Sequence, residues 1–174
     1  MTETARATMP MTVADLAERI WQSRMAFDAA VARLTPEQFL TPGADGWSAK
    51  DTLAHVTSWE QSATAMMLGE PRFAAMGITG DAATMDIDAI NLQLVDLHRE
   101  RPAAEVVAMA RESHARLLGA LATLSDEDLR RPYRDARVGD GPDGDEAIVA
   151  WFAGDTYEHY DEHLPSLRER VNGA

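Results

Sequence analysis

The sequence predicts an all-α protein, a four-helix bundle with a long crossover after its second helix and short additional helices. Apolar residues recur every three or four positions along four long stretches, which is the period of an amphipathic helix. No stretch shows the apolar and polar alternation that is typical of a half-buried strand. The 174 residues, 45% of them hydrophobic, suit one domain. We assign it to residues 11–174, after a flexible tail at residues 1–10.

The first two long helices are expected at residues 12–34 and 48–68. The apolar residues of the first recur at helical spacing, namely Leu16, Ile20, Phe27 and Val31. The second begins at Ser48, which resembles the start of a capping box. Between them, residues 35–38 predict a short helical turn and residues 41–46 predict a loop.

The second half of the chain predicts a crossover and two further long helices. Residues 69–84 are longer than a bundle hairpin needs, so we expect a crossover whose tip could form a lid. Helical spacing then resumes, and Pro102 divides it into a short and a long helix. After a loop at residues 139–144, a last helix is expected at residues 145–170, kinked or restarted at Pro165.

Composition excludes several classes of site. The chain has no cysteine, so disulfides, thiolate metal sites, iron–sulfur clusters and a cysteine nucleophile are excluded. The formal charge of −13, without a basic stripe, predicts no nucleic-acid partner. The start of the chain lacks signal-peptide character, and no apolar stretch approaches the roughly 18 residues of a membrane span. We therefore expect a soluble cytoplasmic protein with no membrane partner.

Three histidines form a candidate metal site. His159 and His163 are four residues apart on the last expected helix, so their rings leave the same face, about 6 Å apart along the axis. His55 lies among apolar residues early in the second long helix and should face inward. A lone buried histidine or a single pair of this spacing is often structural. The combination on two helices is what predicts a metal site.

Two aspartates share the expected helix faces of these histidines. Asp51 precedes His55 by four residues, and Asp155 precedes His159 by four. Each could orient a metal-bound imidazole or act as a base, which makes them the candidate catalytic residues. The remaining histidines, His98 and His114, stand among charged residues and are expected to be exposed.

The order of these motifs resembles the DinB/YfiT-like superfamily. The resemblance rests on Gly46-Trp47-Ser48 with Asp51, on Ala54-His55-Val56 with Trp59-Glu60, and on Tyr157-Glu158-His159-Tyr160 with His163. The segments 155–163 and 88–91 are similar to the ClbS/DfsB branch. The resemblance implies a four-helix bundle, often dimeric, whose three histidines bind nickel, zinc or a similar ion. It also implies thiol-dependent S-transferases or isomerases, and in the ClbS-like branch self-protection hydrolases without an obvious need for the metal.

Two classes of function follow. The first is a metal-dependent hydrolase or thiol-dependent S-transferase that acts on a small molecule in detoxification or stress response. Its cofactors would be a divalent ion, nickel or zinc with iron or manganese as alternatives, and a low-molecular-weight thiol. Its partners would be a small-molecule substrate and, from the resemblance, a second copy in a homodimer. The alternative is a metal-independent small-molecule binding or ClbS-like self-resistance protein, and a vestigial site in a structural protein is a third hypothesis.

Overall fold

The computed structural model describes residues 11–44, 46–80, 85–136 and 145–172, and over these ranges it is built from helices without a strand. The predicted all-α bundle is therefore confirmed. The long elements are α1 (Val13–Ala32), α3 (Ala49–Leu68), α6 (Ala103–Leu121) and the consecutive pair α8 (Ile148–Asp155) and α9 (Tyr157–Val171). The short elements are α2 (Pro36–Leu40), α4 (Arg72–Ala75), α5 (Ile87–His98), the 3-10 helix η1 (Asp128–Arg130) and α7 (Tyr133–Ala136).

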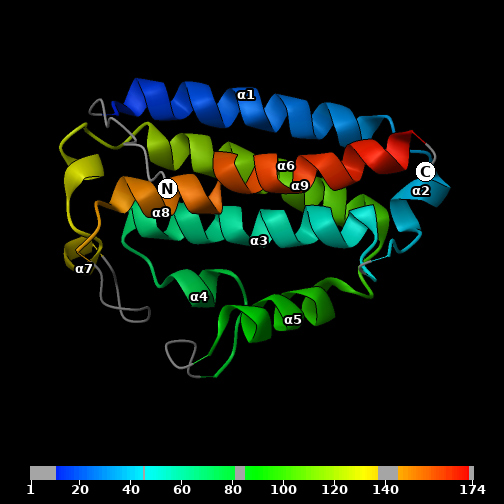
Figure 1. Ribbon diagram of the computed structural model, residues 1–174. Helices are drawn as coiled ribbons and strands as arrows, with labels where there is room; N and C mark the ends of the chain where they lie inside the picture. The colour runs from blue at the N-terminus through cyan, green and yellow to red at the C-terminus, as the bar shows by residue number, and fades with distance from the viewer. Residues whose placement is uncertain (1–10, 45, 81–84, 137–144, 173–174) are drawn as a thin grey trace, which may run out of the picture.

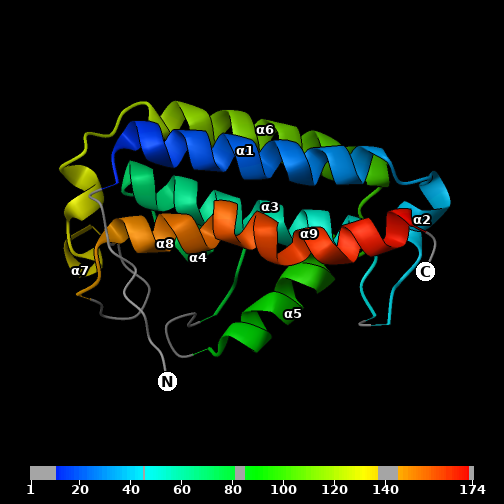
Figure 2. The same cartoon turned by 45° about the horizontal axis from the view of Figure 1, so that its top comes forward.

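The bundle consists of two pairs of neighbouring helices. α1 lies beside α9 and runs in the same direction, whereas α3 lies beside α6 and both run the opposite way (Figure 1). Because α3 and α6 are parallel, the link between them must return along the bundle. This link carries α4 and α5, which pack on the side of α3 that faces away from α1 (Figure 2). The predicted crossover is thus present.

Helix α3 is the central element, because α2, α4, α5, α6, α8 and α9 all contact it. All its residues are buried except Asp51, Gln61 and Leu68. Three of its buried hydroxyls donate back to carbonyls one turn earlier, which satisfies them within the helix: Thr57 to Leu53 at 2.7 Å, Ser58 to Ala54 at 3.0 Å and Thr64 to Glu60 at 2.9 Å. Because these hydroxyls are hydrogen-bonded within α3, the helix can be packed against neighbours on every side.

The crossover packs on α3 through a second apolar cluster and two polar contacts. The cluster comprises Trp59, Phe73, Met76, Ile78, Ile90 and Leu94. The Lys50 ammonium of α3 donates to the carbonyls of Arg99 and Arg101 just after α5. His98 is only 4% exposed, and its Nε2 lies 3.1 Å from the Ser58 hydroxyl. The prediction that His98 is exposed is wrong, because this end of α5 docks against α3 while its charged neighbours face solvent.

The last long helix differs from its prediction. It is interrupted at Thr156, whose backbone angles of φ −128° and ψ −103° are not helical. The Thr156 amide bonds to the Ala153 carbonyl, while its hydroxyl takes the Phe152 carbonyl that a continuous helix would have used. Pro165, by contrast, lies within α9 without ending it. Pro165 and Asp161 are exposed, so the carbonyl that Pro165 leaves without an amide donor can meet solvent.

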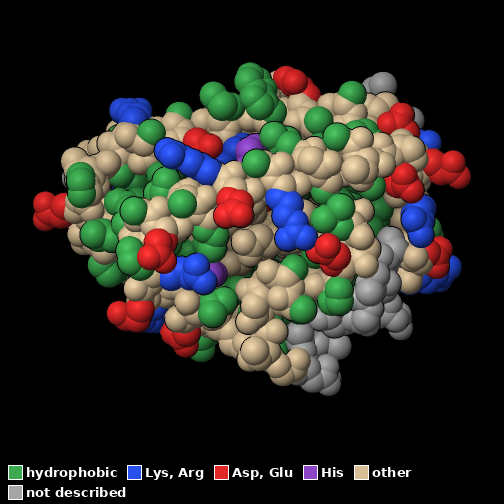
Figure 3. All heavy atoms as spheres, turned by 180° about the vertical axis from the view of Figure 1, so that it is seen from behind, with side chains coloured by type: hydrophobic (Ala, Val, Ile, Leu, Met, Phe, Trp, Pro, Cys, Tyr) green, Lys and Arg blue, Asp and Glu red, His purple; other side chains and the backbone are tan. Residues whose placement is uncertain are grey.

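The surface opposite to that of Figure 1 carries charges of both signs. Acidic and basic side chains alternate over it and are not gathered by sign (Figure 3). Among the described residues, no helix is both long and apolar enough to cross a membrane. The predicted tail at residues 1–10 and loop at residues 139–144, together with residues 81–84 of the proposed lid, lie outside the described ranges.

Two glycines allow a test of the helix geometry. Gly69 ends α3 with φ 68°, in the left-handed region that disfavours side chains, whereas Gly119 lies within α6 with open space where a Cβ would stand. Gly69→Ala should lower the free energy of unfolding by about 1 kcal/mol, and Gly119→Ala should raise it by about 0.5–1 kcal/mol. Urea unfolding of both variants measures this. A shift in the same direction for both would contradict these assignments.

Candidate metal centre

The structure brings together the three histidines that the sequence singled out. His55 projects from α3, and His159 and His163 project from α9. The Nε2 atom of His159 lies 3.0 Å from that of His55 and 3.1 Å from that of His163. One nitrogen from each ring lies within 4.8 Å of the others. Helices α3 and α9 run antiparallel, and their close approach places residues distant in sequence around one point.

Two tryptophans enclose this cluster. The Trp47 ring meets that of His55 edge-on, with 4.9 Å between centroids. Trp59 lies 6.4 Å from the His55 ring and 6.2 Å from the His159 ring, and its indole Nε1 donates to Asn91 of α5 at 3.1 Å. The crossover therefore holds one wall of the site in place through Trp59.

Burial determines the protonation state of His55 and His159. Desolvation, reinforced by the neighbouring imidazoles, lowers the pKa of His55 to about 2 from an ordinary value of 6.5. The same causes, with His163 as the neighbour, lower the pKa of His159 to about 3. Both rings are therefore neutral at physiological pH. A neutral imidazole is the form that can offer a lone pair to a cation.

The protonated nitrogen of each buried ring decides whether Nε2 can face a cation. The Nδ1 atoms of His55 and His159 are buried and have no hydrogen-bond partner among the described residues. With the proton on Nδ1, both Nε2 lone pairs point toward the same space. Three converging imidazoles are a donor set that fits a divalent transition metal.

The two candidate catalytic aspartates contact other groups. Asp51 accepts hydrogen bonds from the Ser48 amide and hydroxyl at 2.9 and 2.6 Å, which caps the start of α3. Asp155 accepts from the Ser62 hydroxyl at 2.7 Å and from Arg72 at 3.0 Å. Ser62 lies seven residues beyond His55, roughly 10 Å further along α3. Asp155 thus engages α3 about two turns from the histidines.

Asp155 and Arg72 form a buried ion pair. Burial raises the pKa of Asp155, and the Arg72 guanidinium and the Ser62 hydroxyl oppose that shift. Arg72 also lies over aromatic rings, 5.1 Å from the centroid of Trp151 and 5.7 Å from that of Trp59. Through Arg72, helix α4 is tied to both α3 and the end of α8.

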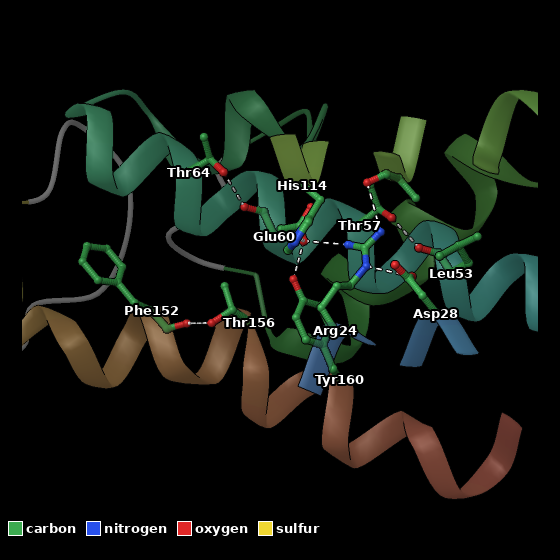
Figure 4. Close-up of polar contacts among 11 residues, drawn as sticks. Arg24, Asp28, Leu53, Thr57, Glu60, Thr64, His114, Phe152, Thr156 and Tyr160 are labelled. Carbon is green, nitrogen blue, oxygen red and sulfur yellow. Dashed lines mark hydrogen bonds and ion pairs between the residues drawn. The ribbon is translucent and has the colours of Figure 1, made fainter. Parts of the chain in front are cut away.

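Sequence reasoning missed a buried polar network around Glu60. The Glu60 carboxylate of α3 is fully buried, and its Oε2 accepts from Arg24 at 2.8 Å, from His114 Nδ1 at 3.0 Å and from the Tyr160 hydroxyl (Figure 4). Arg24 also donates to Asp28 at 2.8 Å. The predicted exposure of His114 is wrong, because its side chain is only 18% exposed and turns inward to Glu60.

The network keeps Glu60 ionised. Burial alone would raise its pKa, but hydrogen bonds and charges from His114, Arg24 and Tyr160 outweigh burial and lower it. The one cue in the sequence is a carboxylate within an expected helix of mostly small and apolar residues, directly after Trp59. Its partners lie on three other helices, which no local pattern indicates.

Two solved structures share this fold. An uncharacterised protein from Escherichia coli UTI89 superimposes with a TM-score of 0.70 over 92% of this chain and 93% of its own, at 14% identity. The colibactin self-resistance protein ClbS, in a complex with double-stranded DNA, gives a TM-score of 0.72 over 93% of this chain and 96% of its own, at 11% identity. No curated protein sequence matches the chain.

The ClbS complex corrects one prediction. The absence of a nucleic-acid partner was inferred from a net charge of −13, and this inference is wrong, because ClbS has this fold and binds double-stranded DNA. Net charge sums over the whole chain, whereas DNA is contacted by a local surface whose charges can differ from the total.

The family assignment rests on the sequence itself. The model of the DinB superfamily matches residues 19–164, a range that begins in α1 and ends in α9 beyond all three histidines. The match covers most of the chain, with α3, α6 and α8 in full and parts of α1 and α9. The chain therefore belongs to the DinB superfamily.

Proposed function

We propose that the chain binds one divalent metal ion through His55, His159 and His163 and acts as a metal-dependent hydrolase or S-transferase on a small molecule. The observation that carries this proposal is the convergence of three Nε2 atoms, with contacts of 3.0 and 3.1 Å. Membership in the DinB superfamily supports it further.

The spacing suits direct coordination. Imidazole nitrogens bind zinc at about 2.0–2.1 Å, so two of them lie about 3.0 Å apart if the angle at the metal is near 90° and about 3.4 Å apart if it is tetrahedral. Two of the three observed separations are closer to the first value, and all three nitrogens lie within 4.8 Å of one another. Three protein ligands would leave at least one coordination position for water or a substrate.

The chemistry of a metal–imidazole site defines the reaction class. A bound divalent ion lowers the pKa of water from about 15.7 toward about 7, or holds a thiol as its thiolate. The first serves hydrolysis and the second serves S-transfer with a low-molecular-weight thiol. Nickel or zinc suits three imidazoles, with iron or manganese as alternatives.

The protein's own residues divide the remaining work. His55 and His159 offer lone pairs without first losing a proton, and His163 is partly exposed, so the site opens to the surface on its side. Trp47 and Trp59 form apolar walls that would exclude bulk water. We assign Asp51 and Asp155 supporting roles, since they cap α3 and anchor α8. A homodimer and a cytoplasmic location stay predictions from the sequence.

Metal content tests the proposal. Purified protein should carry close to one divalent ion per chain, and His159→Ala should lose it, because two remaining imidazoles rarely hold an ion. His98→Ala is the matched control, since His98 is equally buried but contacts Ser58. Elemental analysis of all three proteins provides the measurement. Unchanged metal in His159→Ala would refute the assignment.

The lowered pKa values predict how stability depends on pH. Because the folded pKa of His159 is about 3 and the ordinary value is 6.5, the unfolded chain binds a proton that the folded chain does not between these values. Stability of the metal-free protein should therefore fall as the pH drops below about 6.5. Between pH 7 and pH 5, the free energy of unfolding of His159→Asn should fall by about 2 kcal/mol less than that of the wild-type protein. Urea unfolding in chelator measures this, and equal losses would contradict it.

The similarity to ClbS favours a second candidate, a self-resistance protein that captures or opens a reactive small molecule without a metal. The two candidates predict opposite responses to chelation. Under the first, conjugation of glutathione to a chloronitrobenzene should stop in chelator and return with added zinc or nickel. Under the second, opening of an electrophilic cyclopropane compound should proceed equally with and without chelator. Rates measured in both assays decide between them.

A further inference from the structure

We infer that the Glu60–Tyr160 hydrogen bond is a positioning device that sets the rotation of α9 and thereby holds His159 against His55. The inference rests on the proposed metal site. Tyr160 directly follows His159, so the two side chains leave α9 about 100° apart, one toward Glu60 and the other toward His55. Neither residue of this pair belongs to the histidine cluster.

The acceptor is fixed from three sides. Glu60 Oε2 receives Arg24 from α1, His114 from α6 and Tyr160 from α9, so the carboxylate of α3 is bonded to every other long helix of the bundle (Figure 4). Arg24 is held in turn by Asp28 and by the Ala110 carbonyl at 3.1 Å. All three donors meet Oε2, whereas Oε1 is buried without a hydrogen-bond partner among the described residues, so the position of Oε2 is the one that the network fixes.

The donor is fixed as well. The Tyr160 ring is fully buried, with the Phe27 ring 5.9 Å away and the Arg24 guanidinium 5.7 Å from its centroid. Its hydroxyl loses a buried, charged acceptor if α9 turns, and a buried donor left without a partner is unfavourable. Tyr160 thus resists rotation of the helix at the position next to the metal-binding residue.

Metal coordination by His159 tolerates only a small rotation of α9. A side-chain tip lies about 5–6 Å from its helix axis, so a rotation of about 10° moves the tip by about 1 Å. Metal–ligand distances vary by only about 0.2 Å around their ideal values. The rotation of α9 must therefore be held to within a few degrees.

Other contacts specify this rotation less well. The break at Thr156 separates α9 from α8, so α9 does not inherit its orientation from the preceding helix. The buried side chains of Leu164 and Leu167 also pack α9 against the core, but apolar packing is non-directional. Arg170 near the end of α9 also donates to the carbonyls of Thr41 and Trp47, but the Tyr160 bond comes from the residue next to His159.

Tyr160→Phe tests the inference because it removes one oxygen and leaves the ring. We expect about a tenfold weaker affinity for zinc, in the range found when groups that orient metal ligands are removed. Tyr133→Phe is the matched control, since Tyr133 is equally buried and its hydroxyl has no partner among the described residues. Competition with a chromophoric zinc chelator measures affinity, and urea unfolding measures stability of the same samples.

Glu60→Gln separates positioning from simple loss of stability. The amide oxygen can still accept from Tyr160, so zinc affinity should stay within about threefold of wild type. Its stability should nevertheless fall further than that of Tyr160→Phe, because the buried Arg24 loses its buried counter-charge and keeps only the half-exposed Asp28. Affinities that simply follow stability across both variants, or unchanged affinity in Tyr160→Phe, would overturn the inference. A wild-type protein that binds no zinc, nickel or other divalent ion would instead overturn the proposed function.

Discussion

The arrangement of the bundle depends on one buried charge, the Glu60 carboxylate. Removing an ionised carboxylate from water costs several kcal/mol, and a fold that buries one must supply donors in fixed positions. Here Arg24, His114 and Tyr160 supply them from α1, α6 and α9. Each of the three helices can donate to Glu60 only over a narrow range of rotation and height along α3, because hydrogen bonds require short, well-aligned contacts. The network therefore defines which of the many packings available to apolar faces is adopted.

The candidate site and this network share a single turn of α3. Trp59 faces the histidine rings and the crossover, whereas the next residue, Glu60, faces the opposite helices. This division is possible because α3 is surrounded on all sides and several of its hydroxyls are satisfied by its own backbone. The packing that fixes the bundle and the packing that shapes the site are consequently not independent, since a shift of α3 would disturb both.

The sequence could predict what local spacing determines. His159 and its partner one turn later share a face in any helix, and the apolar surroundings of His55 indicated burial correctly. Asp155 was less predictable, because the helix ends at the next residue and its partners lie 83 and 93 residues away. His98 was wrongly predicted to be exposed, because its charged neighbours in the sequence lie outside the face of α5 that docks on α3. The partners of Glu60 lie 36, 54 and 100 residues away, beyond any periodic pattern.

The positions of the carboxylates bear on the chemistry of the site. Asp155 forms an ion pair with Arg72, and Asp51 accepts a hydrogen bond from Ser48 at the start of α3. Neither carboxylate therefore contacts the histidines. Ligation by neutral imidazoles leaves a divalent ion with its full double charge, whereas carboxylate ligands would reduce it. An ion held by the three histidines would attract hydroxide or thiolate as the compensating anion and would acidify the molecule that delivers it. The engagement of both aspartates by other partners therefore supports the proposed activation of water or a thiol over simple storage of the metal.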